Sequence, residues 1–169
     1  MPDQIRPVNL NDVTALCEIY NHYVEHSIAT FEEVKVSEEE FAHRISVVTR
    51  HYPWLIHEMD GKVTGFAYAN LWKGRSAYRH SLESTIYLDH QSLGLGIGKT
   101  LYQALLDQLV SEQKYHRVMA GISLPNDSSV ALHESLGFTR TAIFPEVGRK
   151  FGRWIDVGYW VLEVPGEYT

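Results

Sequence analysis

The sequence is poor in features that mark several classes of protein. It holds one cysteine, Cys17, among 169 residues, which excludes an internal disulfide framework and suits a reducing compartment. No apolar run approaches the roughly 20 residues that a membrane-spanning helix needs. The first residues, Met1–Arg6, lack the basic and apolar regions of a signal peptide. We therefore expect a cytoplasmic protein that does not act at a membrane.

Concentrated positive charge is also absent. The net charge is −6 with histidine neutral, and no run of lysine or arginine exceeds two residues. Proteins that bind nucleic acid usually carry a basic face that neutralises phosphates, so we expect no nucleic-acid partner. None of the nine histidines has HExxH spacing, and the pair His22 and His26 stands alone. We expect no metal site.

Hydrophobic residues make up 44% of the chain, enough for a sizeable core. The length suits one domain, so residues 1–169 are expected to form a single unit. Alternating apolar patterns predict strands, and these cover Ile5–Val8, Trp54–Met59, Val63–Leu71, Leu82–Leu88, Val118–Ile122, Phe138–Phe144 and Trp154–Glu163. Helical periodicity marks the remaining elements, at Asp12–His26, Ser37–Val48, Ile97–Gln113 and Asp127–Ser135. This order predicts an α/β fold with a mixed, mainly antiparallel central sheet flanked by helices.

Local signals support these boundaries. Ser37 followed by Glu40 has the spacing of a capping box. Asp60 and Gly61 are typical of a tight hairpin turn. In the third predicted helix the apolar residues fall on one face, and they are Leu101, Leu105, Leu106, Leu109 and Val110.

A glycine-rich segment lies between the Leu82–Leu88 strand and the helix that begins at Ile97. Its glycines are Gly94, Gly96 and Gly98. Glycines let a backbone approach a ligand closely, and the free N–H groups of the following helix favour an anion such as phosphate. A ligand-free turn is the plain alternative.

Three motifs compete for this segment. The nucleotide-binding Walker loop would need glycine where Leu93 stands, and the dinucleotide fingerprint would need glycine in place of Lys99. The pattern Gln/Arg-x-x-Gly-x-Gly/Ala fits directly at Gln91, Gly94 and Gly96. This pattern resembles the pyrophosphate loop of the GCN5-related N-acetyltransferases, which bind acetyl-CoA. Downstream, Asn126 precedes a helix that ends in Leu-Gly-Phe138, as in the same family.

The resemblance extends to a narrower family. The blocks Tyr52–Ile56, Trp72–Tyr78, Glu83–Tyr87, Leu132–Phe138 and Trp154–Trp160 are similar to the phosphinothricin acetyltransferases, which include enzymes for methionine sulfoximine and methionine sulfone. The likeness covers Ile5 to Glu163. The chain ends soon after the last predicted strand, whereas some herbicide-resistance members have a longer tail, which favours the methionine-derivative branch.

The resemblance implies acetyl-CoA as co-substrate and a set of residues that contact it. These are Ile86, Tyr87, Leu88, Gln91, Gly94, Leu95, Gly96, Ile97, Gly98, Lys99 and Asn126. Asn126 could instead, or also, cap the helix that begins at Asp127. Lys99 could contact a cofactor phosphate or face solvent.

The resemblance also implies two catalytic residues. An amine must lose its ammonium proton before it attacks, so a base is needed, and Glu83 is the candidate. Partial burial would raise its pKa, although a surface glutamate or one paired with Arg75 or Arg79 is the alternative. A backbone N–H at Tyr87 or Leu88 is expected to face the thioester oxygen. His133 could act as the acid for the leaving thiolate, as a hydrogen-bonding group near the sulfur, or as a structural core residue.

An amino-acid substrate carries a carboxylate, which calls for cationic and hydroxyl donors. The segment before the Glu83 strand supplies Lys73, Arg75 and Tyr78 as candidates, and a solvated basic loop is the alternative. Phe31 is a candidate for one wall of the substrate pocket, and the alternative is that it packs in the core. Together with Glu83 these residues form the expected substrate site.

Two other functions stay open at this point. The chain could acetylate a different amine, such as a peptide N-terminus or a polyamine, or it could be a non-catalytic acetyl-CoA sensor. The resemblance further implies a homodimer, whose interface the sequence does not locate.

Overall fold

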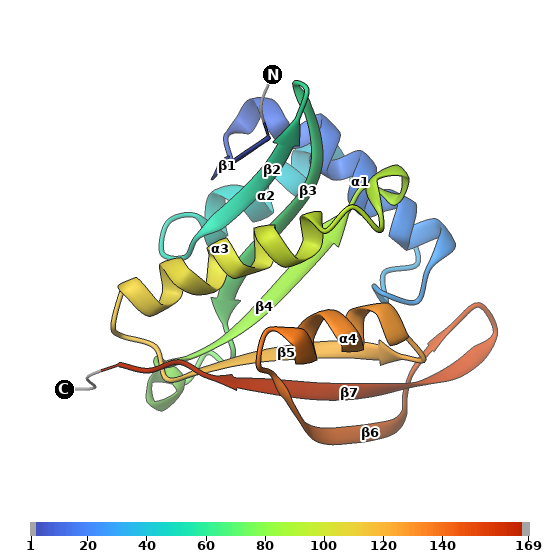
Figure 1. Ribbon diagram of the computed structural model, residues 1–169. Helices are drawn as coiled ribbons and strands as arrows, with labels where there is room; N and C mark the ends of the chain where they lie inside the picture. The colour runs from blue at the N-terminus through green and yellow to red at the C-terminus, as the bar shows by residue number, and fades with distance from the viewer. Residues whose placement is uncertain (1–2, 167–169) are drawn as a thin grey trace.

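One seven-stranded sheet carries the fold in the computed structural model, which describes residues 3–166 (Figure 1). The strands are β1 (Gln4–Pro7), β2 (Trp54–Met59), β3 (Lys62–Leu71), β4 (Ser81–Leu88), β5 (Arg117–Leu124), β6 (Thr139–Lys150) and β7 (Arg153–Glu163). They lie in the order β1-β2-β3-β4-β5-β7-β6. Only β4 and β5 are parallel neighbours, and the other pairs are antiparallel.

Helices cover both faces of this sheet. They are α1 (Val13–His26), α2 (Glu38–Val48), α3 (Ile97–Ser111) and α4 (Asp127–Ser135). The apolar stripe of α3, including the fully buried Leu101 and Leu105, packs with Leu82 and Val118 of the central strands. On the opposite face, α1 and α2 pack against β2 and β3 in a second cluster that contains Phe66. No helix in residues 3–166 is long and apolar enough to cross a membrane.

The predicted order of elements is confirmed, and the bounds of β2 and α4 agree to the residue. Three details differ. The Ser37 hydroxyl accepts the Glu40 N–H, but the Glu40 carboxylate pairs with Arg44 instead of completing the capping box. Val110 is 37% exposed because it lies at the edge of the apolar stripe. The sixth strand continues to Lys150, well past the predicted end at Phe144, because it pairs with β7 as a long hairpin.

The parallel contact between β4 and β5 is short. Their register covers only Ser81–Glu83 against Arg117–Met119. Beyond this point β4 stays paired with β3 to Leu88, while β5 stays paired with β7 to Leu124. The two strands therefore separate after Glu83, and the sheet opens between them (Figure 1).

Candidate active site

A cleft of about 620 Å³ occupies the opening between β4 and β5. Its walls come from the end of α1 and the segment after it, from β4, the glycine-rich segment, β5 and α4. Of the residues singled out from the sequence, it is lined by Glu83, Ile86, Tyr87, Leu88, Gly94, Gly96, Gly98, Lys99, Asn126 and His133. Segments far apart in the chain thus meet where the sheet splits.

The glycine-rich segment forms one end of this cleft. Gly94 and Gly96 have φ values of +79° and +78°, in the left-handed region that glycine adopts without strain. Gly96 is the N-cap of α3 and offers no side chain to the helix N-terminus. The first N–H groups of α3 and the positive end of its dipole are therefore free to meet an anion.

Gly98 faces the cleft at a crowded point. A Cβ placed there would lie 3.1 Å from Leu88 Cδ1 and 3.5 Å from Leu132 Cδ2. A glycine at this position therefore leaves room between β4 and α4 where a larger residue would narrow the cleft.

Asn126 lies across the cleft at the N-terminus of α4. Its side-chain oxygen accepts the Ser129 N–H at 3.2 Å, so Asn126 caps the helix. Capping was one of the two roles predicted for this residue. Because that oxygen is used within the protein, the amide NH₂ group is the part of Asn126 that can donate to a ligand in the cleft.

Glu83 stands where β4 and β5 part. Its side chain is half-buried and forms no hydrogen bond or ion pair with any residue in 3–166, including Arg75 and Arg79. Burial raises the pKa of this carboxyl, and the nearby positive charge of Lys73 partly offsets the rise. An unpaired carboxylate with a raised pKa, at the apex of a cleft, has the properties of a general base.

The backbone of β4 directs hydrogen-bonding groups into the opening. Ser81 O accepts the Trp72 N–H on the β3 side, and the Asp89 N–H donates to Thr64 O on the same side. Along an antiparallel pair without a register shift, the backbone groups of successive residues face alternate sides. The N–H and C=O groups of the odd-numbered residues of β4 therefore face β3, and those of the even-numbered residues face β5. Leu88 is among them, whereas the N–H of Tyr87 faces β3, so of the two predicted oxyanion donors the geometry favours Leu88.

His133 lines the cleft and is only 4% exposed. Its Nδ1 lies 2.7 Å from the Ser129 carbonyl oxygen, which can only accept, so Nδ1 carries the ring proton. Burial lowers the pKa of His133 despite this hydrogen bond. The neutral ring therefore presents Nε2 as an acceptor, which suits a hydrogen-bonding role near the sulfur better than proton donation.

Several predicted residues lie outside the cleft lining. Gln91 is exposed, Leu95 is 61% exposed, and Ile97, the first residue of α3, is buried. Their backbone atoms, which belong to or flank the glycine-rich segment, could still contact the cofactor. The part of these residues in cofactor binding therefore stays a prediction.

The predicted substrate residues are also not gathered in the cleft. Arg75 and Tyr78 lie on the exposed β3–β4 loop, and Phe31 packs against Gly148 on the β6–β7 hairpin. Lys73 is the member nearest to the chemistry, since its charge acts on Glu83 while its ammonium lies 4.6 Å from the Trp72 ring centre. Their roles as substrate contacts stay predictions.

The structure adds residues that the sequence reading missed. Thr85 follows Glu83 at the next alternate position of β4 and shares its face, together with the already predicted Tyr87. Tyr159 lies on β7 with its ring 5.1 Å from that of Trp72, and the charge of Glu83 acts on its hydroxyl. The alternation along β4 was a usable signal for Thr85, whereas the approach of Tyr159 depends on sheet order.

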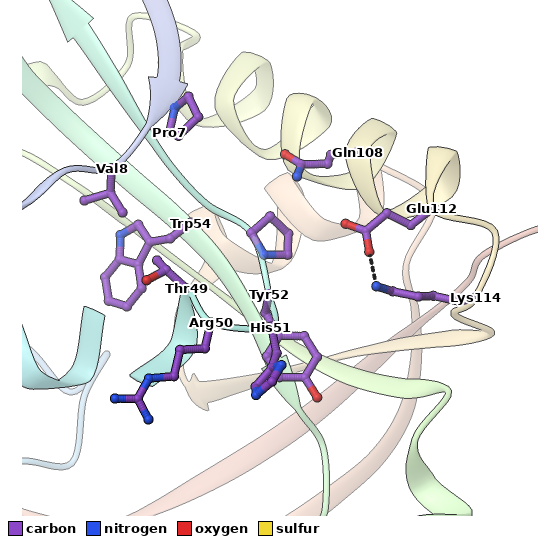
Figure 2. A pocket seen from close by; sticks show the side chains of 11 residues that line it. Pro7, Val8, Thr49, Arg50, His51, Tyr52, Trp54, Gln108, Glu112 and Lys114 are labelled. Carbon is purple, nitrogen blue, oxygen red and sulfur yellow. Dashed lines mark ion pairs between the residues drawn. The ribbon is translucent and has the colours of Figure 1, made fainter. Parts of the chain in front are cut away.

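A second hollow lies at the opposite end of α3 and is shown in Figure 2. Arg50, His51 and Tyr52 line one side, and Glu112 and Lys114 form an ion pair of 2.6 Å on the other. This hollow contains no residue of the glycine-rich segment or of the Asn126 region. The cleft at Glu83 is therefore the candidate active site. Residues 3–166 contain no group of three or more metal-ligating side chains.

Known proteins resemble this chain over most of its length. Residues 5–158 match the family described as acetyltransferase (GNAT) domain. A phosphinothricin N-acetyltransferase from Streptomyces viridochromogenes is 43% identical over 94% of this chain and 86% of its own. An L-methionine sulfoximine/L-methionine sulfone acetyltransferase from Salmonella typhimurium is 37% identical over 95% and 94%. The YncA structure from Salmonella typhimurium, determined with its cofactor acetyl-CoA, superimposes with a TM-score of 0.95 at 34% identity, covering 100% and 98%.

Proposed function

The chain belongs to the GNAT acetyltransferase family, and on that basis we propose that it transfers the acetyl group of acetyl-CoA to the amino group of a small amino-acid analogue. The analogue is of the phosphinothricin, methionine sulfoximine or methionine sulfone type, the substrates that name its relatives. The observation that carries this proposal is the cleft between β4 and β5, which places an unpaired Glu83 opposite a free helix N-terminus.

The cleft supplies groups that match the parts of acetyl-CoA. The N–H groups at the start of α3, framed by Gly94 and Gly96, suit the pyrophosphate, and Lys99 adds a positive charge beside them. The NH₂ group of Asn126 and the open edge of β4 suit the amides of the pantetheine arm. Bound there, acetyl-CoA supplies the activated acetyl group.

Glu83 then acts as the base in the proposed reaction. It takes the proton from the substrate ammonium, directly or through water, so that the nitrogen lone pair can attack the thioester carbon. The backbone N–H of Leu88 faces the opening and suits the negative charge that develops on the carbonyl oxygen. As the new C–N bond forms, the C–S bond breaks, and the leaving thiolate takes up the proton that the acetylated nitrogen loses. The acceptor Nε2 of His133 suits a hydrogen bond from that thiol.

The acceptor amine is proposed from the surroundings of Glu83. Lys73 provides the positive charge that a substrate carboxylate requires, and the rings of Trp72 and Tyr159 offer an apolar wall beside it. Arg75 and Tyr78 on the same loop are proposed as outer substrate contacts, and Phe31 as a more distant wall. A polyamine would lack a partner for Lys73, which favours the amino-acid branch over that alternative.

A thiol-release assay tests this function. Purified protein is given acetyl-CoA with methionine sulfoximine, methionine sulfone, phosphinothricin, a peptide or a polyamine. Release of CoA with the amino-acid analogues is the expected result. Preference for the peptide or polyamine would refute the acceptor class alone, whereas binding of acetyl-CoA without transfer to any amine would favour a sensor.

Further features of the protein are proposals that follow the family. We expect the whole chain to act as one acetyltransferase domain, in the cytoplasm and as a homodimer. Size-exclusion chromatography with light scattering measures the assembly state, and a monomeric mass would refute the homodimer.

A further inference from the structure

A buried lysine contacts the segment that follows α1, which lines the cleft, and this lysine is not part of the proposed chemistry. Lys150, the last residue of β6, is 2% exposed. Its Nζ donates to three backbone carbonyl oxygens, those of Ser27 at 2.7 Å, Thr30 at 2.8 Å and Tyr23 at 3.3 Å. An ammonium has three N–H donors, so these carbonyls satisfy it completely.

The charge of Lys150 is balanced without an ion pair. Among residues 3–166 no carboxylate forms a salt bridge with Lys150; burial lowers the pKa of its ammonium, and the negative charges of Glu33 and Glu32 partly offset this. Tyr23 and Ser27 stand at the C-terminal end of α1, where the helix dipole is negative and the last carbonyls need donors. Lys150 therefore caps a helix that lies more than 100 residues earlier in the chain.

Two of the carbonyls that Lys150 binds, those of Ser27 and Thr30, belong to a segment that we call the strap, residues Ser27–Phe31. The strap is fixed to β4 as well, because the Tyr87 hydroxyl donates to Ala29 O at 3.1 Å. At its far end the Phe31 ring lies directly on Gly148 of β6, so close that a Cβ there would be 2.1 Å from the ring. In Figure 1 the loop that follows α1 runs toward the part of the sheet that carries the β6–β7 hairpin.

The strap thus joins the two parts of the sheet that separate after Glu83. Tyr87 belongs to the part that contains β4, and Lys150 belongs to the part that contains β5, β7 and β6. The strap also lines the cleft through Ser27, Ile28 and Ala29. A segment tied to both sides and lining the space between them controls how far apart the sides stand.

We infer that Lys150 is a positioning residue for acetyl-CoA binding: its ammonium clamps the strap to the β6–β7 hairpin and so sets the width of the cleft. This inference rests on the proposed use of the cleft for acetyl-CoA. Lys150 itself touches neither substrate nor cofactor in this arrangement. Its effect passes through the position of the strap.

Substitution of Lys150 tests the clamp. Lys150→Met keeps the apolar stem but removes the ammonium donor from the Ser27 and Thr30 carbonyls, while Tyr23 O keeps the Ser27 N–H, so acetyl-CoA affinity should fall by about tenfold or more. Hydrogen exchange of the strap amides should become faster in the same variant. The matched control is Lys35→Met, which removes an exposed lysine paired with Glu25 and should change neither measurement. Isothermal titration gives the affinity per folded molecule.

Chemical rescue separates the ammonium from general packing. In Lys150→Ala, added n-propylammonium can occupy the vacated space and donate to the three carbonyls, so affinity for acetyl-CoA should recover. Tetramethylammonium has charge but no N–H donor and should give no recovery. Failure of n-propylammonium in a folded Lys150→Ala protein would overturn the inference, as would unchanged affinity and strap exchange in Lys150→Met.

The wild-type protein keeps the test decisive if neither variant folds. Acetyl-CoA should then slow hydrogen exchange in the strap, and unchanged exchange at saturating acetyl-CoA would contradict the clamp. The two proposals fail differently. Absence of acetyl-CoA binding by the wild-type protein refutes the proposed function, whereas equal binding by wild type and Lys150→Met refutes only the clamp.

Discussion

Replacement of Glu83 by glutamine tests the proposed base with little disturbance of the site. Glutamine has nearly the same shape, and the Glu83 carboxylate has no hydrogen-bond or ion-pair partner among residues 3–166 that would be lost. The substitution therefore removes a negative charge and a proton acceptor while leaving the packing intact. A loss of activity can then be assigned to chemistry instead of to folding.

The expected kinetic effect is large. A positioned general base contributes a factor of about 10²–10⁴ to the rate, which corresponds to roughly 3–5 kcal/mol of activation free energy. Burial raises the pKa of Glu83 above its usual 4.5, and activity requires the deprotonated form. Wild-type kcat/KM should therefore rise with pH through this raised pKa and then level off, and Glu83→Gln should lose that limb.

The same substitution should have the opposite effect on stability. Because the pKa of Glu83 is higher in the folded protein than in the unfolded chain, the folded protein retains a proton that the unfolded chain has lost. Stability contributed by this group is therefore present at low pH and is lost as pH rises from 4.5 toward the folded pKa. Glu83→Gln should be at least as stable as wild type near neutral pH, with the difference vanishing in acid.

Three measurements carry this prediction. Thiol release gives kcat/KM against pH, isothermal titration gives the affinity for acetyl-CoA, and urea unfolding in neutral and acidic buffer gives the stability. Unchanged acetyl-CoA affinity is expected, since the groups proposed for the phosphates are on α3. Full turnover by Glu83→Gln would remove Glu83 as the base. Lower stability at neutral pH would show that the carboxylate has a structural partner and would refute the reasoning from burial.

Other substitutions test separate features. Gly158→Ala would put its Cβ 2.4 Å from Trp160 Cζ3, so urea unfolding should show a loss of about 1–3 kcal/mol, and an unchanged midpoint would contradict it. Gly96→Ala should weaken acetyl-CoA binding beyond the strain of its positive φ, and the matched control Gly152→Ala has a similar φ of +75° but no place in the cleft. Equal binding losses in the two variants would remove the glycine-rich segment from cofactor binding. His133→Phe should weaken acetyl-CoA binding and leave the shape of the pH profile of kcat unchanged, whereas a fall of wild-type kcat at high pH that disappears in the variant would identify His133 as an acid.

Sequence patterns predicted the elements well because each depends on local periodicity. The buried leucines of α3 repeat at helical spacing, and the Asp60–Gly61 turn has the positive φ values that its residues favour. The glycine-rich segment and Asn126 were found from short motifs. Their meeting across one cleft follows from the order of β4 and β5 in the sheet, which no local pattern contains.

The remaining parts of the site depend on long-range packing. Arg75 and Tyr78 are close to Glu83 in sequence, but the β3–β4 loop holds them on the surface. Phe31 packs on Gly148 because the strap meets a hairpin more than 100 residues later. A lysine at the end of a strand, such as Lys150, normally predicts a solvent-exposed charge. Its burial follows from three carbonyls supplied by a distant helix end.

The short register between β4 and β5 bears on folding cooperativity. Each part of the sheet has a complete antiparallel ladder of its own, and only three parallel residue pairs link the two ladders. A ligand held between β4 and β5 would therefore bridge two bodies that the backbone joins weakly, and would make them unfold together. If acetyl-CoA binds there as proposed, it would also act as a structural element, because it would fill the sheet at the place where the strands no longer pair.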